Sequence, residues 1–345
     1  MPHVCCVGIA CLDIVNVVVC YPAEDAAVRT CDEQRVRRGG NATNTLTVLA
    51  GLGASASWLG SVGAGPNAHR CLADLAAAGV STALAVPKAP PACGTGSGSG
   101  VPAVDQPTSY ITLSQASGSR TIVHHNRLAE LEPADFERRL LTRGAGGGGD
   151  SSGLDGVDWL HFEGRNCAAY GEMMRAARRH SEGSGRRRAP LVISLELEKF
   201  QRPGLEQLAP LADVLFVGRA WAEPSGFACA EDALLALAAA AAAPPQELGG
   251  RSAVLPPLRE GVVLVCAWGE AGACALDTGA RPLAVLSSPA FPPPGGAVVD
   301  SVGAGDTFIA GMVWGMATGL PLAQALREAC ALAGRKVGVH GFDLF

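Results

Sequence analysis

Short apolar runs alternate with helix-like stretches along the C-terminal part of the chain. The stretches 170–179 and 231–242 read as helices, and each apolar run is short enough for a strand. Strands that alternate with helices need parallel crossover connections, so helices should cover both faces of the sheet. The pattern therefore predicts an α/β fold with a mainly parallel central sheet. The predicted strands are 157–162, 191–197, 214–217 and 262–267.

The N-terminal part of the chain has a different pattern. Residues 4–19, rich in Val, Ile and Cys, read as a buried strand followed by further extended chain, and 28–38 reads as a second extended segment. Alternating apolar and polar residues, a Ser-Gly-Ser turn and another extended run predict a hairpin over 110–123. We expect a small β-sheet lid on a larger α/β body, within a single domain. The lid segments are about 13–38 and 108–125, and the domain is 1–345.

Four stretches rich in Gly, Pro, Ser and Ala are predicted to be surface loop insertions without an assigned function. They are 87–106, 143–153, 181–188 and 243–257.

Composition and charge narrow the class of protein. The hydrophobic fraction of 48% and the charged fraction of 17% are typical of a protein with a substantial buried core. A formal net charge of −5 argues against general affinity for nucleic acid or anionic membranes. The 12 cysteines include no C-x-x-C pair, and residues 1–20 lack the basic start of a signal peptide. We therefore expect a soluble cytoplasmic protein.

A glycine-rich loop near the C-terminus carries the first candidate chemistry. Gly303, Ala304 and Gly305 let consecutive backbone N–H groups converge into an anion-binding nest, and the helix predicted from Thr307 adds its positive end. Such a nest stabilises a phosphoryl group in transfer. Asp306 is placed to accept the proton of an attacking hydroxyl. From the loop alone, a helix-capping role for Asp306 is equally open.

A second motif precedes a helix predicted over 42–52. Asn41 and Asn44 are three residues apart and should project to one side, with the donors and acceptors that a polyol needs. Gly40 would let the backbone approach a ligand, and Asp13, at the end of the first strand, could accept two hydroxyl hydrogen bonds. Asn41 could instead be a helix N-cap, or the start of a glycosylation sequon, which a cytosolic protein would not use.

Other nucleotide-binding motifs are missing. No Gly-Lys pair occurs anywhere, which excludes the P-loop. The glycine loop lacks the third glycine of a dinucleotide fingerprint, and the His-Arg-Asp and Asp-Phe-Gly elements of protein kinases are missing.

Together the two motifs resemble the signatures of the ribokinase-like PfkB family of sugar kinases. The likeness covers most of the chain, and the G-A-G-D loop at 303–306 is specific to the family. E-G-R-N at 163–166, C-A-W at 266–268 and F-P-P-P at 291–294 resemble its fructose-phosphorylating branch.

This resemblance implies a three-layer α/β sandwich with a β-sheet lid, and a homodimer formed through the lids. It implies ATP-dependent phosphorylation of a ketose, with D-fructose giving fructose 1-phosphate and Asp306 as general base. The implied cofactors are ATP and Mg²⁺, with K⁺ as a further candidate. The implied sugar contacts are Asp13, Gly40, Asn41 and Asn44, and the implied nucleotide contacts are Arg120, Gly269, Glu270, Ala271, Gly272, Gly303, Ala304 and Gly305.

The predicted tip of the lid adds one more candidate. Asp25 follows Tyr21 between the two extended segments, where its carboxylate could reach a sugar in its own subunit or across the dimer. A solvated turn carboxylate is the equally open alternative.

Two departures from the family pattern leave alternatives open. Residues 218–221 lack the N-x-x-E motif that organises Mg²⁺, so the metal ligands are not assigned, and Arg219 becomes a candidate for phosphate contact. Ala271 stands where related enzymes tend to have a second acidic residue. A kinase for another sugar or nucleoside, and a non-catalytic sugar-binding homologue, are the alternative functions.

Overall fold

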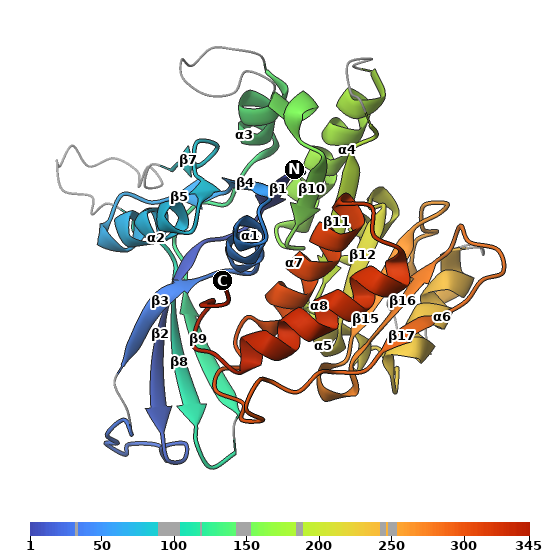
Figure 1. The fold of residues 1–345 in the computed structure, drawn as a ribbon. Coiled ribbons are helices and arrows are strands. Elements are labelled where there is room, and N and C mark those ends of the chain that lie inside the picture. The colour runs from blue at the N-terminus through green and yellow to red at the C-terminus, as the bar shows by residue number, and fades with distance from the viewer. Residues whose placement is uncertain are drawn as a thin grey trace.

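A nine-stranded sheet runs through the centre of the protein, in the order β17-β16-β15-β12-β11-β10-β1-β4-β6 (Figure 1). The computed structural model describes residues 1–31, 34–88, 104–117, 119–142, 153–183, 189–241, 246–247 and 254–345. The strands from β6 to β15 are parallel, and β16 and β17 continue one edge antiparallel. The predicted mainly parallel sheet is confirmed. Its strands are β1 His3–Val7, β4 Ser55–Leu59, β6 Val80–Ser81, β10 Trp159–Phe162, β11 Val192–Leu197, β12 Val214–Gly218, β15 Val263–Ala267, β16 Ala273–Asp277 and β17 Leu286–Ser288.

Helices cover both faces of this sheet, each over its own buried core. One core contains Phe162, Tyr170 and Trp221, and the other contains Trp58 and Met312. The α/β/α sandwich follows from strands that are apolar on both faces. The first core is covered by α3 Pro133–Phe136, η1 Glu137–Leu141, η2 Gly153–Gly156, α4 Cys167–Gly183, η3 Glu206–Leu211, α5 Arg219–Ala222 and α6 Ala230–Ala241. The second is covered by α1 Asn41–Gly51, α2 Pro66–Ala77, α7 Ala304–Ala317 and α8 Leu322–Val337.

A separate four-stranded sheet, called the small sheet below, projects from this body (Figure 1). Its order is β3-β2-β8-β9, with β2 and β8 parallel and the outer pairs antiparallel. The predicted hairpin is confirmed as β8 and β9. The strands are β2 Cys11–Val18, β3 Arg35–Gly39, β8 Thr108–Ser114 and β9 Arg120–His125.

The N-terminal apolar stretch contributes to both sheets. Residues 8–10 are the whole connection between β1 in the central sheet and β2 in the small sheet. Asp13 is the third residue of β2, so its predicted place at the end of the first strand is wrong. The second extended segment is a strand only over β3, because the described residues 28–31 and 34 have no strand pairing.

The remaining elements are short. They are β5 Ser61–Val62 paired with β7 Val86–Pro87, β13 Gln246–Glu247 paired with β14 Val254–Leu255, and η4 Gly269–Ala271 between β15 and β16. Most of the four predicted insertions lies outside the described residues. Within the segments that the structure describes, no helix has both the length and the apolar character needed to cross a membrane.

Candidate active site

The glycine-rich loop turns directly into α7 at the carboxyl edge of the central sheet. Gly303 is the N-cap residue, with a left-handed φ of 83° that favours glycine. A Cβ on Gly303 would lie 2.5 Å from Cζ of Phe342, so the ring requires glycine as well. α7 begins at Ala304, three residues before the predicted start. The Ala304 N–H is donated to Ser301 O over 3.3 Å and the Thr307 N–H to Gly303 O over 2.9 Å, whereas the N–H groups of Gly305 and Asp306 are in the first turn, where a helix offers no acceptor.

Asp306 is the third residue of α7 and is 8% exposed. Its Oδ2 accepts a hydrogen bond of 2.7 Å from Nδ2 of Asn44 on α1. Gly303 occupies the N-cap position, so the interpretation of Asp306 as the cap is wrong. Burial and the nearby charge of Glu196 raise the pKa of Asp306 well above its usual range, against the Asn44 hydrogen bond, which lowers it. A carboxylate with a raised pKa is a stronger base.

Arg38 holds Asn44 in this orientation. Its Nη1 donates to Oδ1 of Asn44 over 3.0 Å, so both ends of the Asn44 amide are engaged. Arg38 itself is buried and is fixed by Asp74 and Thr47, at 2.6 Å each. Asn44, which sequence reasoning assigned to the sugar, therefore contacts the predicted base directly.

Asn41 bridges two carboxylates of β11 and the residue after it. Its Nδ2 donates to Oε2 of Glu196 over 2.9 Å and to Oε2 of Glu198 over 2.8 Å. Both N–H bonds are used, so the amide presents Oδ1 as its free acceptor. The N-cap of α1 is Gly40, which excludes the capping role for Asn41.

A carboxylate from the central sheet supports the start of α1. Oε2 of Glu163, which follows β10, accepts the N–H of Ile9 over 2.9 Å and that of Ala42 over 3.4 Å. A negative group at this position favours the positive end of the helix.

A buried polar chain lies behind Glu196. Oε1 of Glu196 is 2.9 Å from Nε2 of His161, and Nδ1 of His161 is 2.8 Å from Oγ of Ser194. Burial lowers the pKa of His161 to about 4, so the ring is neutral near pH 7. When Glu196 is ionised, His161 must carry its proton on Nε2, and the Ser194 hydroxyl then donates to Nδ1.

Asp13 lies at the junction of the two sheets. In the register of the small sheet it lies opposite Arg37 of β3 and Ser109 of β8, and it is 8% exposed. A Cβ on Gly39 would lie 2.2 Å from Asp13 Oδ2, so the carboxylate occupies space that only glycine leaves. Burial raises the pKa of Asp13.

The strand β3 is also tied to the glycine-rich loop. Asp300 accepts a 2.5 Å hydrogen bond from Arg37, and its carbonyl accepts one of 2.8 Å from the buried Lys336. Although burial opposes it, the Arg37 hydrogen bond holds the pKa of Asp300 at about 2.

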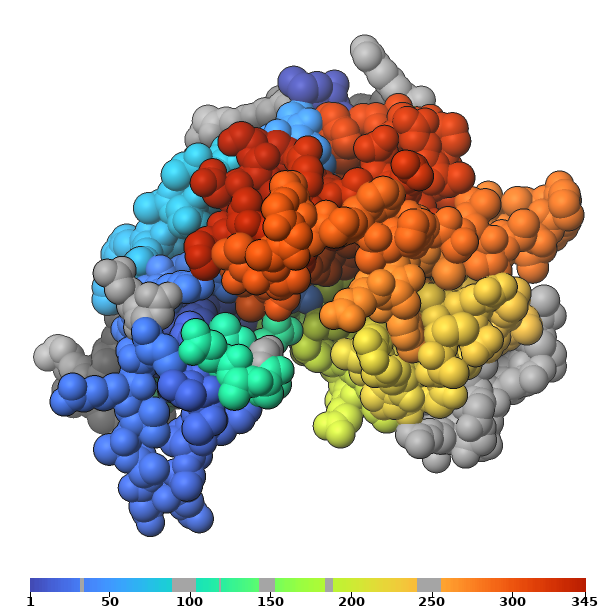
Figure 2. Space-filling view, turned by 60° about the horizontal axis from the view of Figure 1, so that its bottom comes forward, coloured from blue at the N-terminus to red at the C-terminus, as the bar shows by residue number. Residues whose placement is uncertain are grey.

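Several of the hydrogen-bonded groups described above line one pocket of about 110 Å³. Asn41, Glu196, Glu198, Gly305 and Asp306 all contribute to its wall. Figure 2 shows the surface hollowed between the blue and green residues of the small sheet and the yellow and orange residues of the body. Asp13, Gly40 and Asn44 do not line it, although Gly40 precedes Asn41 and Asn44 donates to Asp306.

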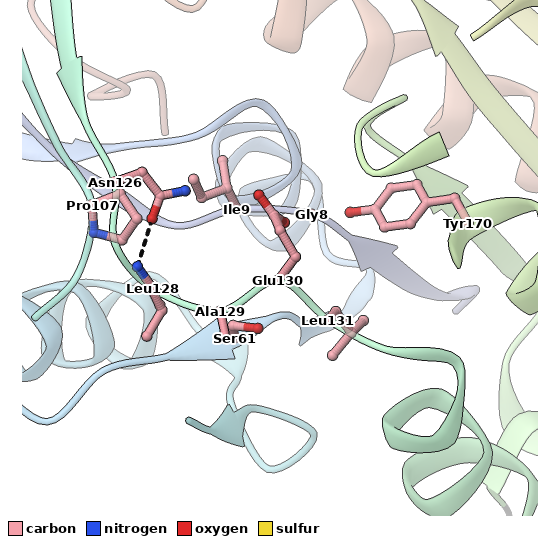
Figure 3. Close-up of a pocket in the computed structure, with 10 residues that line it drawn as sticks. All are labelled: Gly8, Ile9, Ser61, Pro107, Asn126, Leu128, Ala129, Glu130, Leu131 and Tyr170. Atoms are coloured by element: carbon pink, nitrogen blue, oxygen red, sulfur yellow. Dashed lines mark hydrogen bonds between the residues drawn. The ribbon is translucent and has the colours of Figure 1, made fainter. Parts of the chain in front are cut away.

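A second cavity, beside the end of β1, is too small for a sugar. It has about 20 Å³, room for little more than one water. In Figure 3 the hydroxyl of Tyr170 points toward Gly8 and Glu130 at this cavity.

The other predicted contacts lie at the rim or beyond it. Gly269, Glu270 and Ala271 form η4 after β15, and Gly272, with a φ of 89°, closes that turn. Arg120 pairs with Leu113 at the end of the small sheet far from Asp13, and Asp25 is exposed in the β2–β3 connection with a φ of 61°. None of these six residues lines the 110 Å³ pocket.

Sequence reasoning missed the acidic wall of the site. Glu196 and Glu198 are two residues apart, as are His161 and Glu163, and each pair ends or follows an apolar strand. Charged residues at period two within an apolar run were the available signal.

Comparison with solved structures shows that the chain has the ribokinase-like α/β sandwich fold. Arabidopsis thaliana ribokinase complexed with ribose and ATP superposes with a TM-score of 0.70, at 17% identity over 99% of this chain and 94% of that one. Adenosine kinase from Sinorhizobium meliloti gives a TM-score of 0.68, at 19% identity over 99% and 95%.

The chain belongs to the pfkB family of carbohydrate kinases, which it matches over residues 1–94 and 101–344. It is 36% identical to the ketohexokinase of Mus musculus, over 99% of this chain and 98% of that protein. The resemblance found in the sequence motifs is confirmed, and the protein is an ATP-dependent sugar kinase.

Proposed function

We propose that this protein transfers the γ-phosphoryl group of ATP to a ketose, and that D-fructose is converted to fructose 1-phosphate. The 36% identity to mouse ketohexokinase supports the choice of ketose. The observation that carries the proposal is the buried Asp306 beside Gly305 at the start of α7, in the same pocket as Asn41.

In the proposed reaction, Asp306 accepts the proton of the attacking hydroxyl as its oxygen bonds to the γ-phosphorus of ATP. The bond from that phosphorus to the bridging oxygen of the β-phosphate breaks in the same transfer, and ADP leaves. The raised pKa of Asp306 favours this transfer. The Gly305 N–H of the 303–305 loop and the positive end of α7 stabilise the charge that develops on the phosphoryl oxygens, whereas the Ala304 N–H is already donated to Ser301 O. A Cβ on Gly305 would meet no atom within 4 Å, so a phosphate could approach this backbone closely.

Sugar recognition is assigned to the junction of the two sheets. Asn41 offers Oδ1 to a sugar hydroxyl, because its two N–H bonds are held by Glu196 and Glu198. Asp13 and the Gly40 backbone are the further sugar contacts. Asn44 acts by orienting Asp306 in the conformation described.

The nucleotide is proposed to lie along the rim formed by residues 269–272 and the glycine-rich loop. The Arg219 guanidinium stacks 5.7 Å from the Trp268 ring centroid, beside that rim, which suits a phosphate contact. Arg120 would need the small sheet to close over the site.

Mg²⁺ suits the oxygen ligands of this pocket. The described residues contain no group of three or more His, Cys, Asp or Glu side chains arranged to hold a metal ion. Mg²⁺ commonly binds through one or two carboxylates together with waters and substrate phosphates, and Glu198 and Glu196 would serve that role. When bound, the ion neutralises phosphate charge.

The decisive experiment is an ATP-dependent phosphorylation assay across D-fructose, other ketoses, ribose and adenosine, with the product position read by NMR. The proposal requires fructose to give the highest kcat/KM and phosphate at O1. A preference for ribose or adenosine would favour a kinase for another sugar or nucleoside, and no turnover on any substrate would favour a non-catalytic homologue.

A further inference from the structure

A pocket on the opposite edge of the central sheet is lined mainly by arginines. It has about 190 Å³, and its wall consists of Arg175, Arg178, Arg179, Arg259, Met174, Pro210 and Leu211. Four of these seven residues are cationic and none is acidic. In a chain of net charge −5, this is a strong local excess of positive charge.

Its position separates it from the active site. Leu211 precedes β12, and Arg259 precedes β15. Arg175 is at the midpoint of α4 and Arg178 and Arg179 follow it, on a helix that runs back toward the start of β11. The pocket therefore lies at the amino ends of strands whose carboxyl ends face Asp306. In Figure 1, α4 lies at the top of the view, and the small sheet lies at the lower left.

Two of the arginines are held in place by a single carboxylate. Oδ2 of Asp213 accepts a hydrogen bond of 2.7 Å from Nη2 of Arg178, and Oδ1 of the same carboxylate is 3.0 Å from Nε of Arg259. The N–H of Ile193 also donates to Asp213 Oδ2, over 2.8 Å. Two guanidinium groups from separate elements are thus oriented before any ligand arrives.

The other two arginines have no such partner. Arg175 and Arg179 are exposed, four residues apart on one face of α4, and form no ion pair with the described residues. Like charges at this spacing destabilise a helix slightly. An anion bound between them would remove that repulsion.

We propose that this pocket is a second ligand site, which binds a small phosphorylated metabolite carrying two or more negative charges. Guanidinium groups pair with phosphate oxygens through two parallel hydrogen bonds. The pocket of about 190 Å³ has room for a phosphate group and a small attached moiety. Met174, Pro210 and Leu211 supply an apolar surface for that moiety.

Isothermal titration calorimetry with inorganic pyrophosphate, at about 0.15 M salt, tests this site. This salt limits attraction between exposed charges beyond about 8 Å. We expect the double variant R175A/R179A to bind pyrophosphate at least about tenfold more weakly than wild type, because two guanidinium partners are lost. The matched control R29A/R335A removes the same charge from exposed arginines elsewhere, and it should bind as wild type does.

Turnover without added pyrophosphate should be unchanged in R175A/R179A, which separates this site from the active site. Equal affinity in R175A/R179A and wild type, or equal loss in R29A/R335A, would overturn the proposal. Glucose 6-phosphate and ADP, titrated in the same way, distinguish a sugar phosphate from a nucleotide. Tighter binding of an acidic peptide than of all three probes would contradict a small-metabolite site.

Discussion

The side-chain amide of Asn44 on α1 donates to the carboxylate of Asp306 on α7 across 2.7 Å, and the two residues are 262 positions apart in the chain. Because Arg38 fixes the other end of the same amide, the orientation of Asp306 depends on a residue of the small sheet. The predicted base is therefore positioned by both halves of the molecule.

Replacing the base should abolish most turnover. In D306N the side chain keeps its size but cannot accept a proton near neutral pH, so kcat should fall at least ~10²-fold while sugar binding is largely retained. Steady-state kinetics and calorimetry measure the two effects. D232N, an exposed change on α6, is the control. Near-normal turnover in purified D306N would remove Asp306 from the chemistry.

Removing the Asn44 amide should shift the pH dependence of kcat. The Asn44 hydrogen bond lowers the pKa of Asp306, so in N44A that pKa rises further. Asp306 acts in its deprotonated form, and the acid limb of kcat should therefore shift to higher pH. T47A, which removes the 2.6 Å contact to Arg38 Nη2 and a 3.0 Å hydrogen bond to Thr43 O but leaves the Asn44 amide in place, is the control and should shift the limb less. An unmoved limb in N44A would mean that another group controls it.

Sugar affinity should depend on Asn41. N41A removes an acceptor from the wall of the 110 Å³ pocket, at a cost of about 1–3 kcal/mol, so fructose should bind roughly ten- to a hundredfold more weakly. Calorimetric affinity for ATP should barely change. If both ligands were weakened equally, Asn41 would have a structural role.

The pH dependence of the protein's stability should reveal the raised pKa of Glu196. Burial and the charge of Glu198 raise the pKa of Glu196 from 4.5 to about 8. The folded state then holds this proton more tightly than the unfolded state, so ionisation costs stability as pH rises from about 4.5 to about 8.

The E196Q side chain cannot ionise. The free energy of unfolding of E196Q should therefore rise relative to that of wild type as pH increases through this range. Urea denaturation at pH 5 and pH 8.5 gives the difference, and E231Q on the exposed face of α6 is the control. A difference that does not change with pH would contradict the raised pKa.

The small sheet is predicted to form a dimer through its exposed face. Tyr110 and Val123, which are paired across β8 and β9 and point to the same face, are 50% and 65% exposed, an apolar surface that a second copy could cover. Light scattering should give a dimer for wild type, and V123D should shift it toward monomer. A fully active wild-type monomer would end this hypothesis.

Asp25 tests the tip separately. D25A should weaken ketose binding without dissociating the dimer. Unchanged ketose affinity would leave Asp25 as a solvated turn residue.

Local sequence patterns predicted the fold well, because strand and helix periods act over a few residues. The start of α7 was missed because the loop glycines lead directly into the helix at Ala304. The two-sheet division of the first apolar stretch was missed because residues 8–10 do not interrupt its apolar pattern.

Within the site, Asp306 and Asn41 were predictable because each adjoins a glycine motif. Their partners were not, since Glu196 and His161 lie in apolar strands far away in sequence. Only the packing of β10 beside β11 brings those two side chains to 2.9 Å.

The three-residue connection between β1 and β2 is a short hinge about which the small sheet could rotate. β2 has eight residues and, at about 3.3 Å a residue, reaches about 26 Å. A rotation of about 5° at the connection would move its far end by about 2 Å, yet Asp13 by only about 0.6 Å. Contacts made by Asp13 would persist through such a rotation. Contacts made from the tip, where Asp25 lies, would form only when the small sheet has rotated toward the active site.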